Sequence, residues 1–145
     1  MIERWNPDQL VEHQAQLSEA YRQFEGRTTV ANPSHFVNYW HDRYAQGIGQ
    51  IFACHADGHL YASLGGVVGA DMYDGILTAV ELFWNKQVIA PFEWYRLFDV
   101  YEEWARERNA KRIHLSRWFV RGGCDKYFTN ILHYRPSEVH YVKEL

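Results

Sequence analysis

Cysteine, basic residues and long apolar runs are scarce in this chain of 145 residues, and each shortage excludes a class of protein. Two cysteines, Cys54 and Cys124, are too few for a disulfide framework, and Met1 to Asp8 lack the apolar core of a signal peptide. The net charge of −3 argues against general nucleic-acid binding, which needs a basic surface. No apolar run of about 18 residues exists, so we expect no membrane span. These absences predict a cytoplasmic protein in a reducing compartment.

Aromatic residues, in contrast, are abundant and make up 17% of the chain, within a hydrophobic content of 47%. A chain of this length can bury a sizeable core as one domain. No repeat, low-complexity tract or linker interrupts it, so a single domain over residues 1–145 is predicted. Some aromatic rings are also expected to serve a partner surface, because Tyr and Trp are favoured at interface hot spots.

Capping and turn signals divide the chain into helices and strands. Asn6-Pro7 and Asn32-Pro33 are typical helix starts, whereas Asp57-Gly58 and Asp74-Gly75 are typical turns between strands. Runs of antiparallel strands joined to a strand–helix–strand unit predict an α/β fold, with a mixed, mostly antiparallel sheet and helices on both faces. The predicted elements are helices 7–25 and 33–46, strands 50–56, 59–68 and 76–84, a helix 91–108, a strand 112–118, a short helix 125–132 and a strand 136–143.

Three stretches of the second half resemble GNAT acetyltransferases, particularly the small ones that bacteriophages encode. They are residues 81–84 (ELFW), 102–114 (EEWARERNAKRIH) and 134–145 (YRPSEVHYVKEL). The resemblance implies a short strand, two helices, three strands, a helix, a strand, a helix and a final strand. It also implies acetyl-CoA as acyl donor and an amine, on a small molecule or a protein lysine, as acceptor.

The loop that would hold the acyl-CoA diphosphate departs from the family pattern. That pattern is Arg or Gln, two residues, Gly, one residue, then Gly or Ala, because glycine lets the backbone approach phosphate closely. Residues 87–96 read QVIAPFEWYR and contain no glycine; Pro91 has no N–H, and Glu93 sets a carboxylate where the anion would lie. We therefore expect an eroded cofactor site. The resemblance assigns the cofactor contacts to Phe83, Trp84, Val88, Ile89, Ala90, Phe92 and Glu93.

The catalytic residues that the resemblance implies are partly present. Glu81 matches a strand carboxylate that removes a proton from the amine, although an ordinary outward-facing strand residue is an equal alternative. The family's acidic Tyr falls on Thr129, and His133 replaces the glycine that precedes an aromatic residue. Tyr127 is the nearest tyrosine and becomes the candidate proton donor.

Two functions remain open at this stage. The eroded loop favours a binding protein on a GNAT frame that inhibits or redirects a host bacterial protein, and the alternative is a working acetyltransferase. The predicted partner surface consists of Trp94, Tyr95, Trp118 and Phe119, and a homodimer is an open possibility. We predict no metal site, because His55 and His59 lack further ligands at zinc-site spacing.

Overall fold

The computed structural model describes every residue except 18–32, 88, 91, 117–125, 138–142 and 144–145. Backbone contacts divide the chain into two compact units, Met1–Leu115 and Ser116–Leu145. The first unit holds the sheet and the α-helices, and the second holds a short helical turn. The single domain expected from the sequence stays a prediction.

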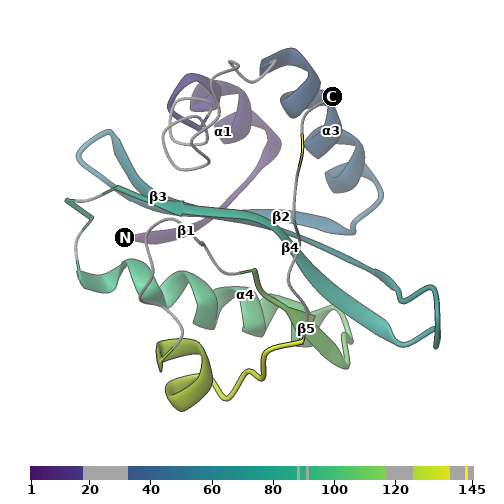
Figure 1. The fold of residues 1–145 in the computed structure, drawn as a ribbon. Coiled ribbons are helices and arrows are strands. Elements are labelled where there is room, and N and C mark those ends of the chain that lie inside the picture. The colour runs from purple at the N-terminus through teal and green to yellow at the C-terminus, as the bar shows by residue number, and fades with distance from the viewer. Residues whose placement is uncertain (18–32, 88, 91, 117–125, 138–142, 144–145) are drawn as a thin grey trace. The chain divides into compact units, whose positions relative to one another are not determined.

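Five strands of the first unit form one sheet in the order β1-β2-β3-β4-β5 (Figure 1). Neighbours from β1 to β4 are antiparallel, and β5 is parallel to β4. This arrangement confirms the predicted mixed, mostly antiparallel sheet, and β1 is the short strand expected before the first helix. The strands are β1 (Ile2–Trp5), β2 (Gly49–Ala56), β3 (His59–Ala70), β4 (Leu77–Lys86) and β5 (Arg112–His114).

Helices cover both faces of this sheet, as predicted: α1 and α3 lie on one face and α4 on the other (Figure 1). A capping box begins α1, in which the Asn6 side chain accepts from the Gln9 N–H and the Gln9 side chain accepts from the Asn6 N–H. Asn109 follows α4 with a φ of 61°, in the left-handed region in which many helices end. The helices are α1 (Pro7–Glu12), α3 (Pro33–Ala45) and α4 (Arg96–Glu107).

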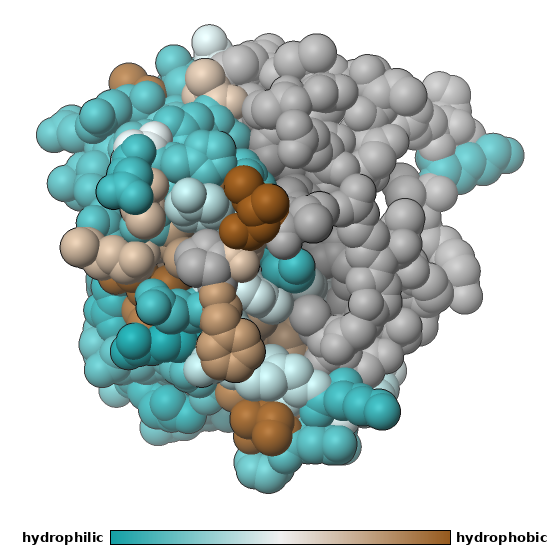
Figure 2. Space-filling view, turned by 90° about the vertical axis from the view of Figure 1, so that its left-hand side faces the viewer, coloured by the Kyte–Doolittle hydropathy of each residue, from teal (hydrophilic) through white to brown (hydrophobic). Residues whose placement is uncertain are grey.

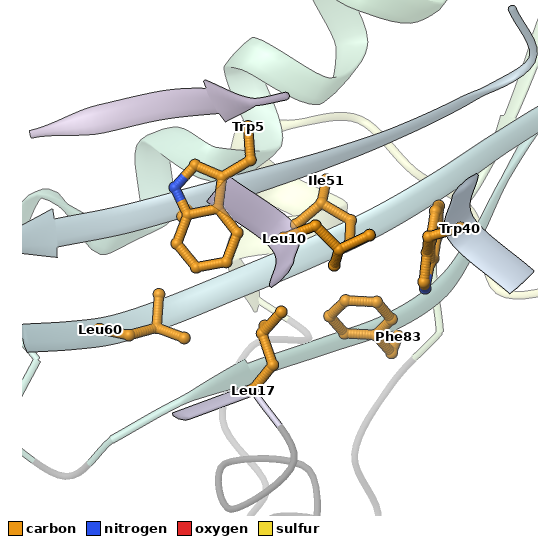
Figure 3. Close-up of a cluster of buried hydrophobic side chains, with 8 residues drawn as sticks. Trp5, Leu10, Leu17, Trp40, Ile51, Leu60 and Phe83 are labelled. Carbon is orange, nitrogen blue, oxygen red and sulfur yellow. The ribbon is translucent and has the colours of Figure 1, made fainter. Parts of the chain in front are cut away.

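A hydrophobic core fills the sheet face under α1 and α3 (Figure 3). The Phe83 ring of β4 lies 5.8 Å from the Trp40 ring of α3, nearly edge-to-face at 84°. Such a contact adds to the free energy of apolar burial. The buried cluster consists of Trp5, Leu10, Leu17, Trp40, Ile51, Ala53, Leu60 and Phe83.

The opposite face is packed by the apolar stripe of α4. Phe52 of β2 contacts Tyr101 and Trp104 of α4, with ring centroids 6.0 and 5.8 Å apart. Phe98 and Ala105 of the same stripe are buried as well. These buried residues recur at helical spacing and form one face of α4.

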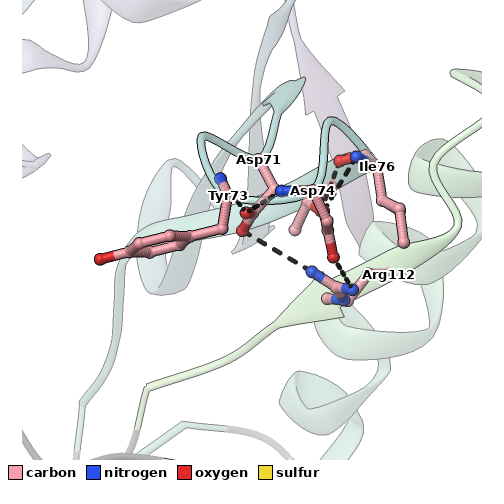
Figure 4. Close-up of polar contacts among 6 residues, drawn as sticks. Asp71, Tyr73, Asp74, Ile76 and Arg112 are labelled. Carbon is pink, nitrogen blue, oxygen red and sulfur yellow. Dashed lines mark hydrogen bonds and ion pairs between the residues drawn. The ribbon is translucent and has the colours of Figure 1, made fainter.

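A polar network holds the turn between β3 and β4 (Figure 4). The Asp71 carboxylate accepts from the Tyr73 N–H at 2.8 Å, and the Asp74 carboxylate accepts from the Ile76 N–H at 3.0 Å. Arg112 of β5 donates to Asp74 at 2.7 Å and lies 3.6 Å from the Asp71 carboxylate. The hydrogen bond from Arg112 lowers the pKa of Asp74. The network thus fixes the place where β5 joins β4.

Some predicted boundaries in the first unit are wrong. The helix expected from Pro91 begins instead with a 3-10 turn, η1 (Phe92–Tyr95), which precedes α4. The strand expected over 112–118 ends at His114, and its described continuation, residues 115 and 116, is not in a strand.

The second unit contains one π-helical turn, η2 (Tyr127–Ile131), where the sequence predicts a short helix. His133 follows it with a φ of 60°, in the left-handed region that glycine adopts most easily. The GNAT resemblance implies glycine at this position, which would adopt the same conformation with less strain. The final strand expected over 136–143 lies mostly outside the described residues, and residues 136, 137 and 143 are not in a strand.

Candidate functional site

A β-bulge interrupts the pairing of β3 with β4. Gly65 pairs with Phe83, whereas Gly66 pairs with Glu81, so Leu82 is an extra residue on β4. Leu82 is 43% exposed although it lies between buried neighbours on the strand. A glycine pair inside a strand often marks a bulge, and here the extra residue lies on the facing strand.

Bulky rings on both sides of the sheet require glycine at this bulge. A Cβ on Gly65 would lie 2.3 Å from Phe83 and 2.6 Å from Trp40. A Cβ on Gly66 would lie 2.4 Å from Tyr101 of α4. Both distances are too short for real contacts, so the bulge and the packed rings depend on each other.

Beyond the bulge, β4 is no longer paired with β5. Their parallel pairing extends from Thr78 and Arg112 to Val80 and His114, and β5 ends there. Within the described residues, β4 continues to Lys86 with a strand partner on the β3 side alone. The GNAT resemblance implies such a divergence of two strands.

Glu81 lies where the bulge and the divergence meet. Its side chain is 6% exposed, and it pairs with Gly66 on the sheet face that Tyr101 covers. The structure thus places Glu81 in the interior and not at an outward-facing position. A buried carboxylate at this place can hold or take a proton out of contact with bulk water.

The loop after β4 is anchored to the start of β3 through Gln87. The Gln87 N–H donates to the Tyr61 carbonyl at 2.7 Å, and the Gln87 side chain donates to the Leu60 carbonyl at 3.0 Å. The same side chain lies 2.8 Å from Nε2 of His59. The Ala90 N–H donates back to the Gln87 carbonyl at 3.1 Å, so this amide of the expected diphosphate loop already has an acceptor.

The 3-10 turn η1 occupies the place where the resemblance puts a helix N-terminus for the diphosphate. Glu93 lies exposed in its first turn, so its carboxylate would repel an anion there. Tyr95 precedes α4 in a helical conformation and gives no side-chain cap to the helix. The loop therefore offers a diphosphate fewer favourable groups than the family pattern does.

The apolar side chains of this loop point outward. Ile89 is 71% exposed and Phe92 is 82% exposed. Figure 2 faces this side of the molecule and shows separate brown side chains among teal ones. Apolar side chains that stand singly are common on protein surfaces, and only a continuous patch would by itself indicate a partner surface.

Trp94 and Tyr95, two of the predicted partner residues, are half-buried. The Trp94 ring stacks on Trp84 with centroids 6.0 Å apart and planes 9° apart, and Lys86 Nζ lies 5.3 Å from its centroid. Tyr95 contacts the Phe92 ring at 5.1 Å. Both residues thus lie beside the loop, with Phe92 the most exposed ring of the group.

The remaining predicted residues belong to the second unit or lie outside the described residues. Tyr127 and Thr129 belong to the second unit, where the Thr129 hydroxyl donates to the Asn130 side chain at 3.2 Å. Val88, Trp118 and Phe119 lie outside the described residues.

Cysteine and histidine offer no further site in the part of the chain that is described. Burial raises the pKa of the Cys54 thiol, which disfavours a nucleophilic thiolate. His55 contacts the His13 ring at 4.9 Å, whereas His59 joins Gln87. No group of three or more possible metal ligands occurs among these residues. Nor does any described helix have the length and apolarity needed to cross a membrane.

Sequence reasoning missed Leu82 and the anchoring role of Gln87. The signal for Leu82 was the Gly65-Gly66 pair, since a glycine pair inside a strand often marks a bulge. The signal for Gln87 was its match to the first position of the family loop, but its partners on β3 have no local sequence signal.

No family model and no curated protein sequence matches this chain. Solved structures do match over nearly its whole length. A ribosomal-protein-alanine N-acetyltransferase from Brucella melitensis biovar Abortus 2308 is 13% identical, with a TM-score of 0.72 over 100% of this chain and 98% of that one. A GNAT family acetyltransferase from Staphylococcus aureus is 14% identical, with a TM-score of 0.69 over 100% and 98%.

A third similar structure is a predicted acetyltransferase from Clostridium acetobutylicum that was solved with acetyl-CoA. It is 7% identical to this chain, with a TM-score of 0.77 over 99% of this chain and 95% of that one. Identities this low establish the fold alone. The chain has the fold of the GNAT acetyltransferases, with a mixed five-stranded sheet flanked by helices on both faces.

Proposed function

We propose that this chain is an acyl-CoA-dependent N-acyltransferase, with acetyl-CoA as donor and an amine as acceptor. One observation carries the proposal: Glu81 is buried at the bulge where β4 diverges from β5. The fold shared with GNAT acetyltransferases supports it, as does the Clostridium structure with acetyl-CoA.

In this reaction Glu81 acts as the general base. The acceptor nitrogen forms its bond to the acyl carbon as the thioester C–S bond breaks, and the proton of the amine passes to the Glu81 carboxylate, directly or through water. Burial suits this role, because a carboxylate shielded from water holds a proton more readily than an exposed one. Tyr127, or water, is the candidate donor of the proton that the thiolate needs.

The donor site combines a favourable edge with an unfavourable loop. The stretch of β4 after the bulge, which carries Phe83 and Trp84, lies beyond the end of its pairing with β5, and we expect an extended ligand to lie along it. The diphosphate would contact Ile89, Ala90, Phe92 and Glu93. The Ala90 N–H already donates to the Gln87 carbonyl. We therefore expect acetyl-CoA to bind weakly, in the upper micromolar to millimolar range.

The direct test is Glu81→Gln, assayed by release of free thiol from acetyl-CoA with a panel of small amines and lysine peptides. Loss of the base should lower kcat about 100-fold with little change in KM. Glu12→Gln, at an exposed carboxylate on α1, is the matched control and should keep full activity. An unchanged kcat in a folded Glu81→Gln protein would remove Glu81 from the mechanism.

A second candidate function is a binding protein on the same frame, which acts on a host bacterial protein if the chain is encoded by a bacteriophage. The observation that favours it is the outward position of Ile89 and Phe92 in the loop where a diphosphate would bind. Trp94 and Tyr95 would then lie at the edge of the contact surface. The sequence prediction also assigns Trp118 and Phe119 to partner binding.

Calorimetry with acetyl-CoA separates the two candidates. Binding that saturates at millimolar donor or below supports the acyltransferase. No heat of binding and no thermal stabilisation at millimolar acetyl-CoA would reject it and leave the binding protein as the better explanation.

A further inference from the structure

Two glutamine side chains from distant parts of the sequence hold the backbone of one buried residue. The Leu60 N–H donates to Oε1 of Gln16 at 3.0 Å. The Leu60 carbonyl accepts from Nε2 of Gln87 at 3.0 Å. Gln16 lies in the helical turn after α1, whereas Gln87 begins the loop expected to bind the acyl donor.

The backbone groups of Leu60 need these two partners because Leu60 has no strand partner on the β4 side. A bulge at Tyr61 shifts the register with β2, and the ladder with β4 ends at the pair of Ala62 and Lys86. The N–H and C=O groups of one strand residue point toward the same edge of the strand. Leu60 is 2% exposed, so both groups would be costly to leave without a hydrogen bond.

Each glutamine is held in place by further contacts. The Gln16 side chain also donates to the Gly58 carbonyl at 3.3 Å, and the adjacent Leu17 is part of the buried core. Gln87 is fixed by its N–H on the Tyr61 carbonyl and by the contact of its side chain with His59. The pair therefore forms a rigid connection between the α1 side of the sheet and the donor loop.

The donor loop takes its position from this connection. The Ala90 N–H donates to the carbonyl of Gln87, so a shift of Gln87 would move the turn that carries Ile89 and Ala90. A shift of Gln16 would free the N–H of Leu60 and loosen the strand residue to which Gln87 is bonded.

We propose that Gln16 and Gln87 form a clamp on Leu60 that positions the donor loop, and that Gln87 is a positioning residue for the acyl-CoA donor. The second half of this statement rests on the proposed acyltransferase function. The clamp itself is a property of the protein without a ligand, and it is testable alone.

Hydrogen exchange without any ligand tests the clamp. Gln16→Met and Gln87→Met should each raise the exchange rate of the Ala90 amide by about tenfold, because local opening becomes easier. Gln16→Glu keeps the acceptor for the Leu60 N–H but loses the donor to the Gly58 carbonyl, so its exchange rate should lie between those of the wild type and Gln16→Met. Gln46→Met, at an exposed glutamine after α3, is the matched control. Unchanged exchange at Ala90 in Gln16→Met, a residue remote in sequence, would overturn the clamp.

Acetyl-CoA calorimetry on the same variants tests the positioning role. Gln87→Met should weaken binding about tenfold and Gln16→Met about threefold, and the double variant should be no weaker than Gln87→Met, because both act on one residue. Gln87→Arg retains a donor for the Leu60 carbonyl and should restore most of the affinity. In the active enzyme, Gln87→Met should raise the KM for acetyl-CoA at constant kcat.

Two outcomes of calorimetry would overturn the positioning role in different ways. Lower thermal stability with unchanged affinity in Gln87→Met would show that the clamp stabilises the fold without positioning the donor. No binding by the wild-type protein would reject the acyltransferase and the positioning role together, whereas the exchange rates would still decide whether the clamp exists.

Discussion

The two ends of β4 are built in opposite ways. At its start, β4 is paired on both sides, and the turn before it is fixed by Asp71, Asp74 and Arg112. At its end, β4 bulges at Leu82, is unpaired on the β5 side within the described residues, and leads into a loop with exposed apolar side chains.

The start of β4 therefore has the features of a structural scaffold, whereas its end has those of a functional site. The polar network at the start satisfies backbone groups and holds strand register, and it buries no charge without a partner. The other end keeps a buried carboxylate and exposed apolar groups, both of which cost stability and persist best where function needs them. The comparison predicts that substitutions at the bulge lower the free energy of unfolding strongly, whereas substitutions in the exposed loop change it little.

Among substitutions that add a single methyl group, the largest effect is expected from Gly65→Ala at the bulge. The added methyl would lie 2.3 Å from Phe83 and 2.6 Å from Trp40, so the rings must move. Overpacking of this kind should lower the free energy of unfolding by about 2 kcal/mol, measured by urea denaturation. Gly69→Ala on the same strand is the control, because no atom lies within 4 Å of its new methyl. Equal stabilities of the two variants would show that the rings do not depend on the bulge.

Most of the scaffold could be predicted from local sequence patterns. The turn at Asp57-Gly58 needs left-handed backbone, and the structure has φ angles of 51° and 73° there. The apolar stripe of α4 was visible because its spacing follows the helical period. These features depend on neighbours in sequence, which a single chain displays directly.

The site could be predicted less well because its contacts join distant segments. Glu81 was visible as a carboxylate, but its burial comes from packing against the α4 face, which no spacing on β4 reveals. The clamp joins Gln16 to Gln87 through Leu60, and neither Gln16 nor Leu60 has a local sequence signal. The bulge had a signal in the glycine pair, although the extra residue lies on the other strand.

A smaller effect is expected from Arg112→Met at the start of β4. The hydrogen bond from Arg112 holds the pKa of Asp74 below its usual value, so it stabilises the fold above the unfolded pKa of about 4. This contribution is lost as the pH falls through the lower pKa of the folded state. We expect Arg112→Met to lower Tm by a few degrees at pH 7, and the difference from wild type to shrink below about pH 4. A constant difference at all pH values would assign the effect to packing of the arginine chain.

The smallest effect on stability is expected from Phe92→Ser in the exposed loop. Phe92 is 82% exposed and contacts one ring, Tyr95, so its removal should change the free energy of unfolding by less than about 0.5 kcal/mol. Trp84→Ala removes a buried ring from the same region and should cost about 3 kcal/mol. Urea denaturation of both variants measures the contrast. Similar losses in the two would mean that the loop end of β4 is part of the scaffold, and the division between its two ends would fail. A neutral Phe92→Ser, in contrast, leaves its apolar surface without a folding role and strengthens the case for a binding one.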